Sequence, residues 1–541
     1  MMHTLAWILI ALWIVPALVR TYQVARYYQI EEYQSARFLR WLRDRRTRWF
    51  PRYIAVPMLI GIVISAALQL AKIDEPALHF VLWVIVGGFV SRPEPVKETK
   101  KQFNRTPRAK RLLVSASVVL AFFIIGAALF TTRNMDADTP QELSTVAIIG
   151  FGGILLSPVA LVAGNQLMYP VEAAMRRRFR EQARRKLQDS GATVIGITGS
   201  FGKTSTKHFL AHILGGQYKV LPTPKSYNTL MGVSLAINNA TDGYDFFIAE
   251  MGAYIPGEIA EICQLARPQI SIVTAVGPQH LERFKTLENI VKAKYEIVEG
   301  LPPDGCAVFN GDNAYVLGMA ERGYPQNRII VSQEGLPQAR LLAENIRQTI
   351  DGLFFDVLDR ETNERHPFQT RLLGLHNVTN ILCAAAAARF IGLSLAEIGM
   401  RVSVLTPAEH RLSARTLPGG ITVIDDSYSA NPVGAISALE VLKLYDTGRR
   451  IVITPGMVEL GDLQEEENYR LGMRLPDYAT DVILVGVEQT RPIQRGVHET
   501  SFDLSRLLVM DTFEAARSWF QTQIRPGDTV LFLNDLPDTY L

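Results

Sequence analysis

"VIGITGSFGKTSTKHFL", residues 194–210, is the stretch that decides the fold. An apolar run leads into a glycine-rich turn, then into Lys203-Thr204-Ser205 and a segment of helical character. A strand, a glycine turn and a helix in this order are typical of a phosphate-binding loop, because backbone N–H groups and the positive end of the helix dipole converge on the anion. The stretch therefore predicts a nucleotide site in an α/β domain.

The loop keeps the physical parts of a P-loop without its strict spelling. Ile197 stands where the general pattern has its first glycine, but Gly199 and Gly202 still allow the backbone to close on phosphate oxygens. Lys203 is placed to reach the β- and γ-phosphates, and Thr204 to hold Mg²⁺. A plain glycine turn between a strand and a helix is the alternative interpretation of the loop alone.

Charge is divided unevenly along the 541 residues, which are enough for about three domains. The segment up to Asp189 carries 26 Lys and Arg against 13 Asp and Glu, and the remainder carries 30 against 40. Such a division indicates a basic segment at an anionic surface joined to an acidic soluble body. The basic residues flank apolar runs, so a membrane is favoured over nucleic acid as the partner.

Five apolar runs precede the phosphate loop, at 4–19, 53–71, 77–90, 112–130 and 146–168. A helix needs about 20 residues to cross a hydrocarbon core of about 30 Å, so 77–90 is also explained as a buried or re-entrant helix. Loop 20–52 carries nine arginines and loop 91–111 carries eight basic residues. Because basic loops stay in the cytoplasm, we expect five spans, an outside N-terminus and a membrane domain over 1–189. The protein would then lie in the cytoplasmic membrane, with the segment from residue 190 onward in the cytoplasm.

The chain from 190 onward resembles the Mur ligase superfamily, and within it the MurF-type ligases. The segments that carry the resemblance, in order, are "TGSFGKTS" (198–205), "FFIAEMGAYIPGEI" (246–259), "SIVTAVGPQHLERF" (271–284), "ENIVKAKYEIV" (288–298), "LLGLHNVTNILC" (372–383), "EHRLSA" (409–414), "ITVIDDSYSANP" (421–432) and "ITPGMVELG" (453–461). Each segment alone is weak evidence, but their shared order makes chance agreement negligible.

The resemblance implies an α/β fold with a P-loop central domain over 190–408 and a Rossmann-like C-terminal domain over 409–541. The pattern of the residues supports the same fold class, because strand-like runs alternate with helix-length segments, which is typical of parallel sheets. The runs expected to form strands are Val194–Ile197, Phe246–Ile248, Ile270–Val276, Ile421–Ile424, Arg450–Thr454, Val482–Val485 and Thr529–Leu533.

The resemblance also implies an ATP site with two Mg²⁺ ions. The nucleotide ligands it implies are Gly199, Ser200, Gly202, Lys203, Thr204, Ser205, Asn377, Asn380, Arg411 and Asp426. The metal ligands it implies are Thr204, Glu250, His280 and Lys294, and the residues it implies for catalysis are Lys203, Glu250, His280, Lys294 and Arg411. Lys294 would bind metal as a carbamate, Asn380 would meet the adenine, and Arg411 and Asp426 would reach the phosphates and ribose. Taken singly, such a glutamate is more often a solvated surface residue, such a histidine a core residue and such a lysine an ordinary helix lysine.

The family reaction is amide formation, in which ATP activates a carboxylate as an acyl phosphate and an amine displaces the phosphate. Two features depart from the MurF pattern. The five apolar runs stand in place of a small UDP-sugar-binding domain, and Asn534-Asp535 stand where a K-G-S-R-type segment would begin. A small-molecule or lipid-linked carboxylate and an amino-acid or dipeptide amine are therefore both open as substrates, and no residue indicates the oligomeric state. The function implied by the resemblance is a membrane-anchored ATP-dependent amide ligase in peptidoglycan or related cell-wall peptide assembly. A poly-γ-glutamate-type polymer ligase and a non-catalytic ATP-binding scaffold are the alternative functions.

Overall fold

The computed structural model describes residues 2–44, 46–92, 103–134, 140–241, 243–428 and 431–534. Its contacts divide the chain into a helical unit within residues 1–177 and an α/β unit within residues 178–537. The predicted boundary at residue 189 lies at the end of helix α7, whereas the contacts divide the chain inside that helix. The reason is that Ala183 and Leu187, on the last turns of α7, are buried in the core of the α/β unit.

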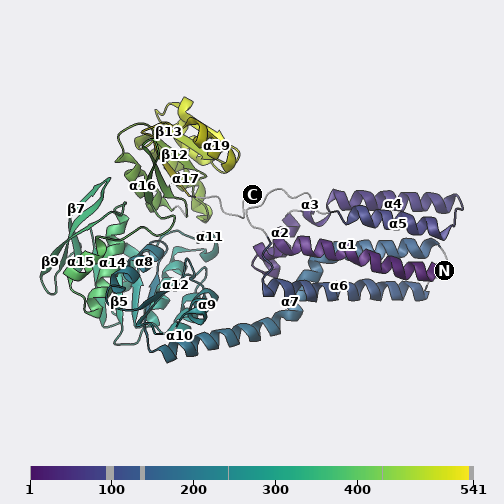
Figure 1. Ribbon diagram of the computed structural model, residues 1–541, viewed down its shortest axis with the longest axis horizontal. Coiled ribbons are helices and arrows are strands. Elements are labelled where there is room, and N and C mark those ends of the chain that lie inside the picture. Colours follow the sequence, from purple (N-terminus) through teal and green to yellow (C-terminus); the bar gives the residue numbers. More distant parts are fainter. Residues whose placement is uncertain are drawn as a thin grey trace. The chain divides into compact units, whose positions relative to one another are not determined.

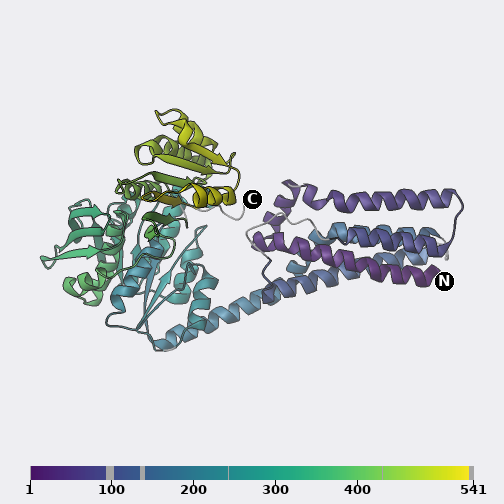
Figure 2. The same cartoon turned by 45° about the horizontal axis from the view of Figure 1, so that its top comes forward.

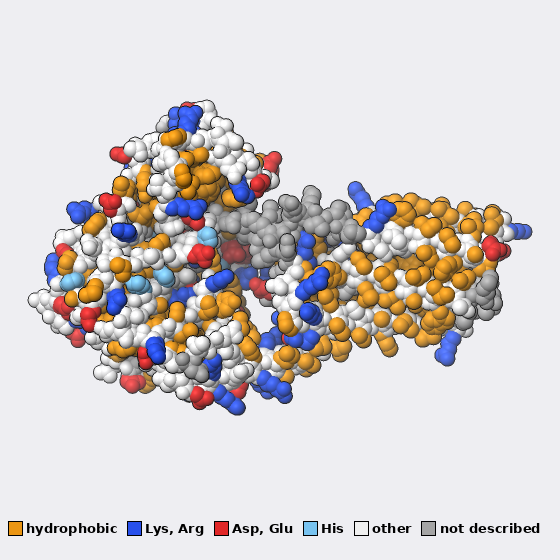
Figure 3. Space-filling view, in the orientation of Figure 1, with side chains coloured by type: hydrophobic (Ala, Val, Ile, Leu, Met, Phe, Trp, Pro, Cys, Tyr) orange, Lys and Arg blue, Asp and Glu red, His pale blue; other side chains and the backbone are white. Residues whose placement is uncertain are grey.

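The helical unit is built from seven helices in its described part, and hydrophobic side chains cover most of the face seen in Figure 3. They are α1 (Met2–Ile30), α2 (Ser35–Asp44), α3 (Arg46–Trp49), α4 (Arg52–Leu70), α5 (Pro76–Val90), α6 (Pro107–Asn134) and α7 (Pro140–Ser190). By length and composition, α1, α4, α6 and α7 can cross a membrane.

The third of the five expected spans, at 77–90, corresponds to helix α5, which is shorter than the helices at the other four runs. This helix has 15 residues, which is about 22 Å at 1.5 Å per residue, against about 30 Å of hydrocarbon. The structure thus has four helices of spanning length in its described part. Residues 93–102 of the predicted basic loop lie outside the described residues.

Small residues let the helices of this unit approach closely. A Cβ on Gly150 of α7 would lie 2.7 Å from Cβ of Trp13 on α1, and one on Gly164 would lie 2.7 Å from the backbone N of Ala116 on α6. In a bilayer no hydrophobic effect drives helices together, and small residues there allow the close van der Waals contact that holds them. Gly150 and Gly164 therefore allow α7 to lie directly against α1 and α6.

The α/β unit begins with a nine-stranded sheet in the order β2-β3-β1-β4-β5-β6-β7-β8-β9. Its strands are β1 (Thr193–Thr198), β2 (Val220–Pro222), β3 (Phe246–Glu250), β4 (Ile270–Val273), β5 (Cys306–Asn310), β6 (Asn327–Ser332), β7 (Leu341–Thr349), β8 (Gly352–Asp359) and β9 (Glu364–Thr370). All neighbouring strands pair in parallel up to β6–β7, and β7, β8 and β9 pair antiparallel. The antiparallel part was not expected from the sequence.

Helices cover both faces of this sheet (Figure 1). One core cluster joins the sheet to α8 (Lys203–Leu214), α14 (His376–Ile391) and α15 (Leu395–Val402). The other face is covered by α9 (Leu230–Asn239), α10 (Glu258–Ala266), α12 (Leu287–Glu299) and α13 (Ala314–Ala320), with the short α11 (Leu281–Phe284) beside α12. Burial on both faces is what the continuous apolar runs of β1, β3 and β4 require.

A second sheet of six strands follows in the order β10-β11-β15-β12-β13-β14 (Figure 2). Its strands are β10 (Ser413–Leu417), β11 (Ile421–Asp426), β12 (Arg450–Thr454), β13 (Asp481–Val485), β14 (Leu507–Met510) and β15 (Thr529–Leu533). Its helices are α16 (Pro432–Lys443), α17 (Gln464–Arg474), α18 (Arg491–His498) and α19 (Phe513–Gln523), with 3₁₀ turns η1 (Gly461–Leu463), η2 (Leu475–Asp477) and η3 (Leu504–Arg506). Among the described strands of this sheet, β10 and β11 pair antiparallel and the other neighbours pair in parallel.

The α/β fold class and all seven expected strands are therefore confirmed, with boundaries that differ by a few residues at most. Below, the part that carries the nine-stranded sheet is called the central domain, and the part that carries the six-stranded sheet the C-terminal domain.

Candidate active site

The phosphate loop leaves β1 at Thr198 and enters α8 at Lys203, as the sequence predicts. Gly199 and Gly202 have φ of +154° and +84°, and residues with a Cβ rarely adopt such positive values. A Cβ on Gly202 would lie 2.6 Å from Oδ1 of Asn380, and one on Gly199 would overlap Oγ1 of Thr274. Both glycines are therefore required by backbone conformation and by space.

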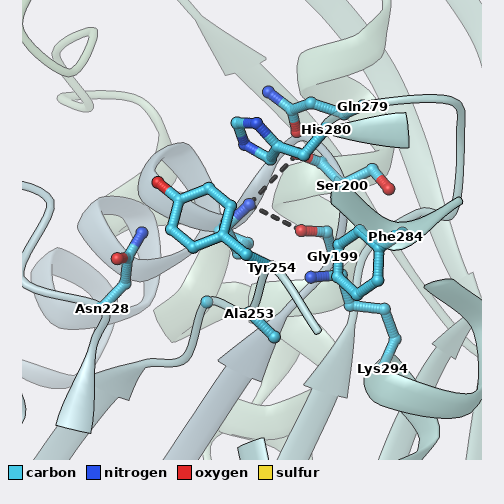
Figure 4. Close-up of a pocket in the computed structure, with 11 residues that line it drawn as sticks. Gly199, Ser200, Asn228, Ala253, Tyr254, Gln279, His280, Phe284 and Lys294 are labelled. Atoms are coloured by element: carbon cyan, nitrogen blue, oxygen red, sulfur yellow. Dashed lines mark hydrogen bonds between the residues drawn. The ribbon is translucent and has the colours of Figure 1, made fainter. Parts of the chain in front are cut away.

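Lys203 lies across its own loop. Its Nζ donates hydrogen bonds to the carbonyl oxygens of Gly199 at 2.6 Å and of Ser200 at 3.1 Å (Figure 4). Burial lowers the pKa of Lys203 to about 8, and the nearby carboxylate of Glu250 opposes the shift. At neutral pH the side chain is therefore still mostly a cation, held at the loop by bonds that phosphate oxygens can replace.

Glu250 ends β3 and lies at the centre of a buried polar cluster. Its side chain is 1% exposed, and its Oε2 accepts hydrogen bonds from Lys207 Nζ at 2.9 Å and from Thr204 Oγ1 at 3.1 Å. Asn228 donates to Oε1 at 3.3 Å. Burial alone would raise the pKa of Glu250, but Lys207 and Lys203 outweigh it and hold the pKa below its ordinary value. The group is thus an anion with a cation already beside it.

Lys207 was not among the predicted site residues. It lies on α8 one turn after Lys203, so the two side chains share a helix face. Its Nζ also donates to the carbonyl oxygen of Lys225, in the segment after β2. That spacing of four residues in the quoted stretch is the signal that could have identified it.

A small pocket opens beside the loop, and Figure 4 shows its side chains converging on it. It is lined by Gly199, Ser200, Lys203, Asn228, Gly252, Ala253, Tyr254, Gln279, His280, Phe284 and Lys294. Three predicted catalytic residues, Lys203, His280 and Lys294, thus share one pocket. Thr204 and Glu250 do not line it, but Asn228 connects Glu250 to its wall.

Lys294 enters this pocket from α12. It is 3% exposed, and its Nζ lies 5.7 Å from the centre of the Phe284 ring. Burial and, to a smaller extent, the charge of Lys203 lower its pKa to about 7, while Glu258 and Glu296 oppose the shift. About half of the amine is therefore uncharged near pH 7.

His280 stands at the pocket edge, where the two domains touch. Its Nδ1 lies 2.6 Å from Oε2 of Glu459, in the segment after β12. The ring packs edge-on against Tyr254, with centroids 4.9 Å apart. Glu459 lies inside the quoted "ITPGMVELG" but was not predicted as a site residue.

The two asparagines of the "HNVTN" segment are buried under the loop. Asn380 Nδ2 donates to Asn377 Oδ1 at 3.1 Å, and Thr206 of α8 donates to Asn380 Oδ1 at 3.3 Å. Asn377 in turn donates to the carbonyl oxygen of Leu373. In this structure both polar atoms of Asn380 therefore have partners within the protein, and the adenine contact stays a prediction.

One serine of the loop, Ser200, has structural partners, and the other, Ser205, is buried. Ser200 donates from Oγ to the carbonyl oxygen of Gly277 at 3.0 Å, and from its backbone N to that of Ala275 at 2.7 Å. Ser205 is buried on α8. Ser200 thereby fastens the loop to the segment after β4, whichever ligand the loop holds.

The C-terminal domain contributes a cation and a carboxylate. The Arg411 guanidinium lies 4.1 Å from the centre of the Tyr428 ring, and Tyr428 Oη donates to Ser226 Oγ in the central domain at 2.7 Å. Burial raises the pKa of Asp426 to about 6, with Arg411 opposing the shift. The positive charge of Arg411 also contributes to the lowered pKa of Lys203, so Arg411 lies close enough to act on the phosphate loop.

Comparison with known proteins agrees with this arrangement. The family model of the Mur ligase middle domain matches residues 197–388, and that of the Mur ligase, glutamate ligase domain matches 410–534. The UDP-N-acetylmuramoyl-tripeptide–D-alanyl-D-alanine ligase of Mycobacterium leprae is 32% identical over 372 residues, covering 64% of this chain and 71% of that protein. The chain belongs to the Mur ligase family. As a Mur ligase of the MurF-like kind, it is an ATP-dependent carbon–nitrogen ligase.

Two further relatives extend the comparison. The enzyme of the same name from Escherichia coli K12 is 32% identical over 383 residues, which are 70% of this Mur ligase and 78% of that protein. The crystal structure of the MurF ligase of Thermotoga maritima in complex with ADP is similar with a TM-score of 0.59 and 25% identity, covering 66% of this chain and 80% of that chain. The resemblance to the Mur ligases, and within them to the MurF type, is confirmed.

Proposed function

We propose that this chain is a membrane-anchored ligase of peptidoglycan assembly that joins the carboxylate of a muramyl tripeptide to the amine of D-alanyl-D-alanine. The observation that carries the proposal is the single pocket formed by Lys203, His280 and Lys294, in a chain 32% identical to ligases of that name. Charged groups that converge on one small buried pocket suit a reaction in which charge moves between phosphate and carboxylate.

The chemistry is a phosphoryl transfer followed by an acyl transfer. The acceptor carboxylate attacks the γ-phosphorus of ATP, the bond to the β,γ-bridging oxygen breaks, and an acyl phosphate and ADP result. The amine then attacks the acyl carbon, and inorganic phosphate leaves as the amide forms. Lys203 stabilises the negative charge on the phosphoryl oxygens, and Arg411 adds a second cation from the C-terminal domain. Contact between the domains keeps water from the acyl phosphate.

The residues at the loop fit Mg²⁺, which Mur ligases use generally. Thr204 Oγ1 and Glu250 Oε2 lie 3.1 Å apart, and oxygen ligands of this kind are those that the ion prefers. The ammonium of Lys207 on the same Oε2 indicates that this carboxylate is built to face a cation. Thr204 and Glu250 would hold one ion, and His280 with a carbamate on Lys294 a second. Bound there, the metal supplies neutralisation of the charge on the phosphoryl oxygens.

A carbamate on Lys294 needs an uncharged amine, because only the free base attacks CO₂. The lowered pKa of about 7 provides that form in a buried position. We expect a carbamate carbon signal when the full chain is equilibrated with ¹³C-bicarbonate, and its loss in Lys294→Arg. A spectrum identical for the two proteins would refute the modification.

Membrane attachment is supported by four apolar helices of spanning length. Their exposed side chains include Leu70 at 86%, Phe122 at 82% and Phe130 at 71% exposure, and apolar surface of that extent is unfavourable in water. We propose a multi-pass protein of the cytoplasmic membrane with its catalytic domains in the cytoplasm. The same helices favour a second candidate acceptor, a lipid-linked muramyl tripeptide delivered within the bilayer.

The test uses the full chain in detergent with ATP, Mg²⁺, D-alanyl-D-alanine and either UDP-linked or lipid-linked muramyl tripeptide, with products read by mass spectrometry. Lys203→Ala removes the loop cation, and Lys219→Ala is a matched control because Lys219 is exposed. A new amide together with ADP, absent in Lys203→Ala and present in Lys219→Ala, supports the proposal and identifies the acceptor. In a parallel reaction a glutamate acceptor replaces the muramyl tripeptide. Products only in that reaction would favour the polymer ligase, and no turnover with any of these acceptors would favour the scaffold.

A further inference from the structure

Two residues with unusual backbone conformations meet at the edge of the pocket. His280 has φ of +55° and Glu459 has φ of +63°, values that are uncommon for residues other than glycine. His280 belongs to the central domain and Glu459 to the C-terminal domain, and their side chains are joined at 2.6 Å. Strained conformations persist only where the surroundings determine them, and they concentrate at functional sites.

The backbones around these two residues are also in contact. A Cβ on Gly461 would lie 3.3 Å from the backbone N of Glu282, so the two segments touch without side chains between them. On the other side of His280, Tyr254 packs against the ring, and the Arg283 guanidinium lies 4.1 Å from the centre of the Tyr254 ring. The imidazole is therefore held between an aromatic ring of one domain and a carboxylate of the other.

A carboxylate on one ring nitrogen decides what the other can do. If Glu459 accepts the Nδ1 proton, the neutral imidazole has its lone pair on Nε2, the form that binds a metal ion or accepts a proton. Carboxylates in this position also fix the ring orientation and increase the basicity of the ligand. Since Glu459 comes from the C-terminal domain, it can do this only while the two domains are in contact.

We propose that Glu459 is a positioning residue that prepares His280 for its metal-side role only when the C-terminal domain has closed on the central domain. The inference rests on the proposed function, in which His280 serves the second metal site. It makes the histidine a link between domain closure and assembly of the catalytic centre. Glu459 itself touches His280 and is not assigned a contact with substrate.

The test measures Mn²⁺ binding in the presence of ADP, by electron paramagnetic resonance on the full chain in detergent. The variants are Glu459→Ala, Glu459→Gln, His280→Ala and the Glu459→Ala/His280→Ala double variant. Glu488→Ala is the matched control, because that side chain is 75% exposed and pairs only with nearby Arg491 among the contacts described.

We expect Glu459→Ala to weaken the second Mn²⁺ site about 10- to 100-fold, as loss of a carboxylate behind a metal-bound histidine does. Glu459→Gln keeps an oxygen acceptor and is expected to lose less, and Glu488→Ala to bind as the wild type. The double variant should bind no more weakly than His280→Ala alone. Hydrogen exchange of residues 278–286 with ADP bound should rise in Glu459→Ala, which checks the contact without any metal.

Neither measurement needs an acceptor substrate. A failure of ligation with muramyl substrates would therefore overturn the proposed function, whereas the role of Glu459 is decided by Mn²⁺ binding and hydrogen exchange alone. Wild-type Mn²⁺ affinity in Glu459→Ala would overturn the role proposed for Glu459. Additive losses in the double variant would overturn it as well, because a residue that acts through His280 has no effect once His280 is gone.

Discussion

Replacing Lys207 with methionine tests the buried pair at the centre of the site. The side chains of Lys207 and Glu250 are 6% and 1% exposed, and their charged atoms lie 2.9 Å apart. Methionine fills a similar volume and removes the charge, so Glu250 is left as a buried anion that keeps its hydrogen bonds from Thr204 and Asn228 but has lost its ion-pair partner, with Lys203 as the cation that still acts on it. Breaking a buried pair in this way costs about 3–5 kcal/mol of unfolding free energy.

The pH dependence of this loss has a definite sign. In the wild type the lowered pKa of Glu250 contributes stability that is present above its ordinary value of 4.5 and is lost as the pH falls through the folded value. Without Lys207, burial dominates and we expect the pKa of Glu250 to rise above that value. The destabilisation of Lys207→Met should therefore be greatest near pH 8 and shrink toward pH 5, where Glu250 takes up a proton.

Calorimetry of the full chain in detergent measures the effect, with the catalytic transition identified as the one that ADP shifts. For a domain of 150–250 residues, a loss of about 3 kcal/mol lowers Tm by about 6–12 °C. Lys207→Met/Glu250→Gln should recover part of the loss, and Lys219→Met, at an exposed site, should lose almost nothing. A decrease below about 2 °C at pH 8, or an equal decrease at pH 5, would refute the reasoning.

Three further predictions concern the loop and its cations. Gly199→Ala should weaken ADP binding about 100-fold, or about 2.7 kcal/mol by calorimetric titration, because its Cβ would overlap Thr274 Oγ1; unchanged affinity would mean that the loop has another conformation. The kcat/KM for ATP should fall tenfold per pH unit above about 8, where Lys203 loses its proton and its charge; a flat profile up to pH 10 would contradict that assignment. Tyr428→Ala should raise KM for ATP about fivefold, since the stacking of Arg411 on the ring is worth about 1 kcal/mol. Tyr428→Phe keeps the ring and should leave KM unchanged. Equal effects of the two substitutions would assign the role to the hydroxyl group.

Much of the fold follows from local patterns. The β1–loop–α8 unit is readable because an apolar run, two glycines and a lysine determine it within a short stretch. The antiparallel β7–β9 part was missed because its strands alternate buried with partly exposed positions and contain a bulge between Glu344 and Arg347. Their apolar residues are interrupted, so no continuous run marks them as part of the main sheet.

The site shows the same division between local and distant information. Lys203, His280 and Lys294 could be found because each lies in a segment with its own pattern, and the structure brings them into one pocket. Glu459 could not be inferred as the partner of His280, because the two lie 179 residues apart in different domains. The spacing of Asn377 and Asn380 predicts a shared helix face, and the two side chains do bond to each other. What that face meets depends on packing between α14 and α8, which spacing does not reveal.

The helix under the phosphate loop has a consequence for how this enzyme can change over evolutionary time. Ala384–Ala388 of α14 have no exposed surface, and α14 packs against α8 and the sheet. Any larger side chain there overpacks the core, and any smaller one is glycine, which weakens the helix. Substitutions on the side of the loop that faces α14 are therefore expected to destabilise the protein. New nucleotide preferences are therefore expected to arise on the opposite side, from Arg411 and the half-exposed Tyr428 of the C-terminal domain.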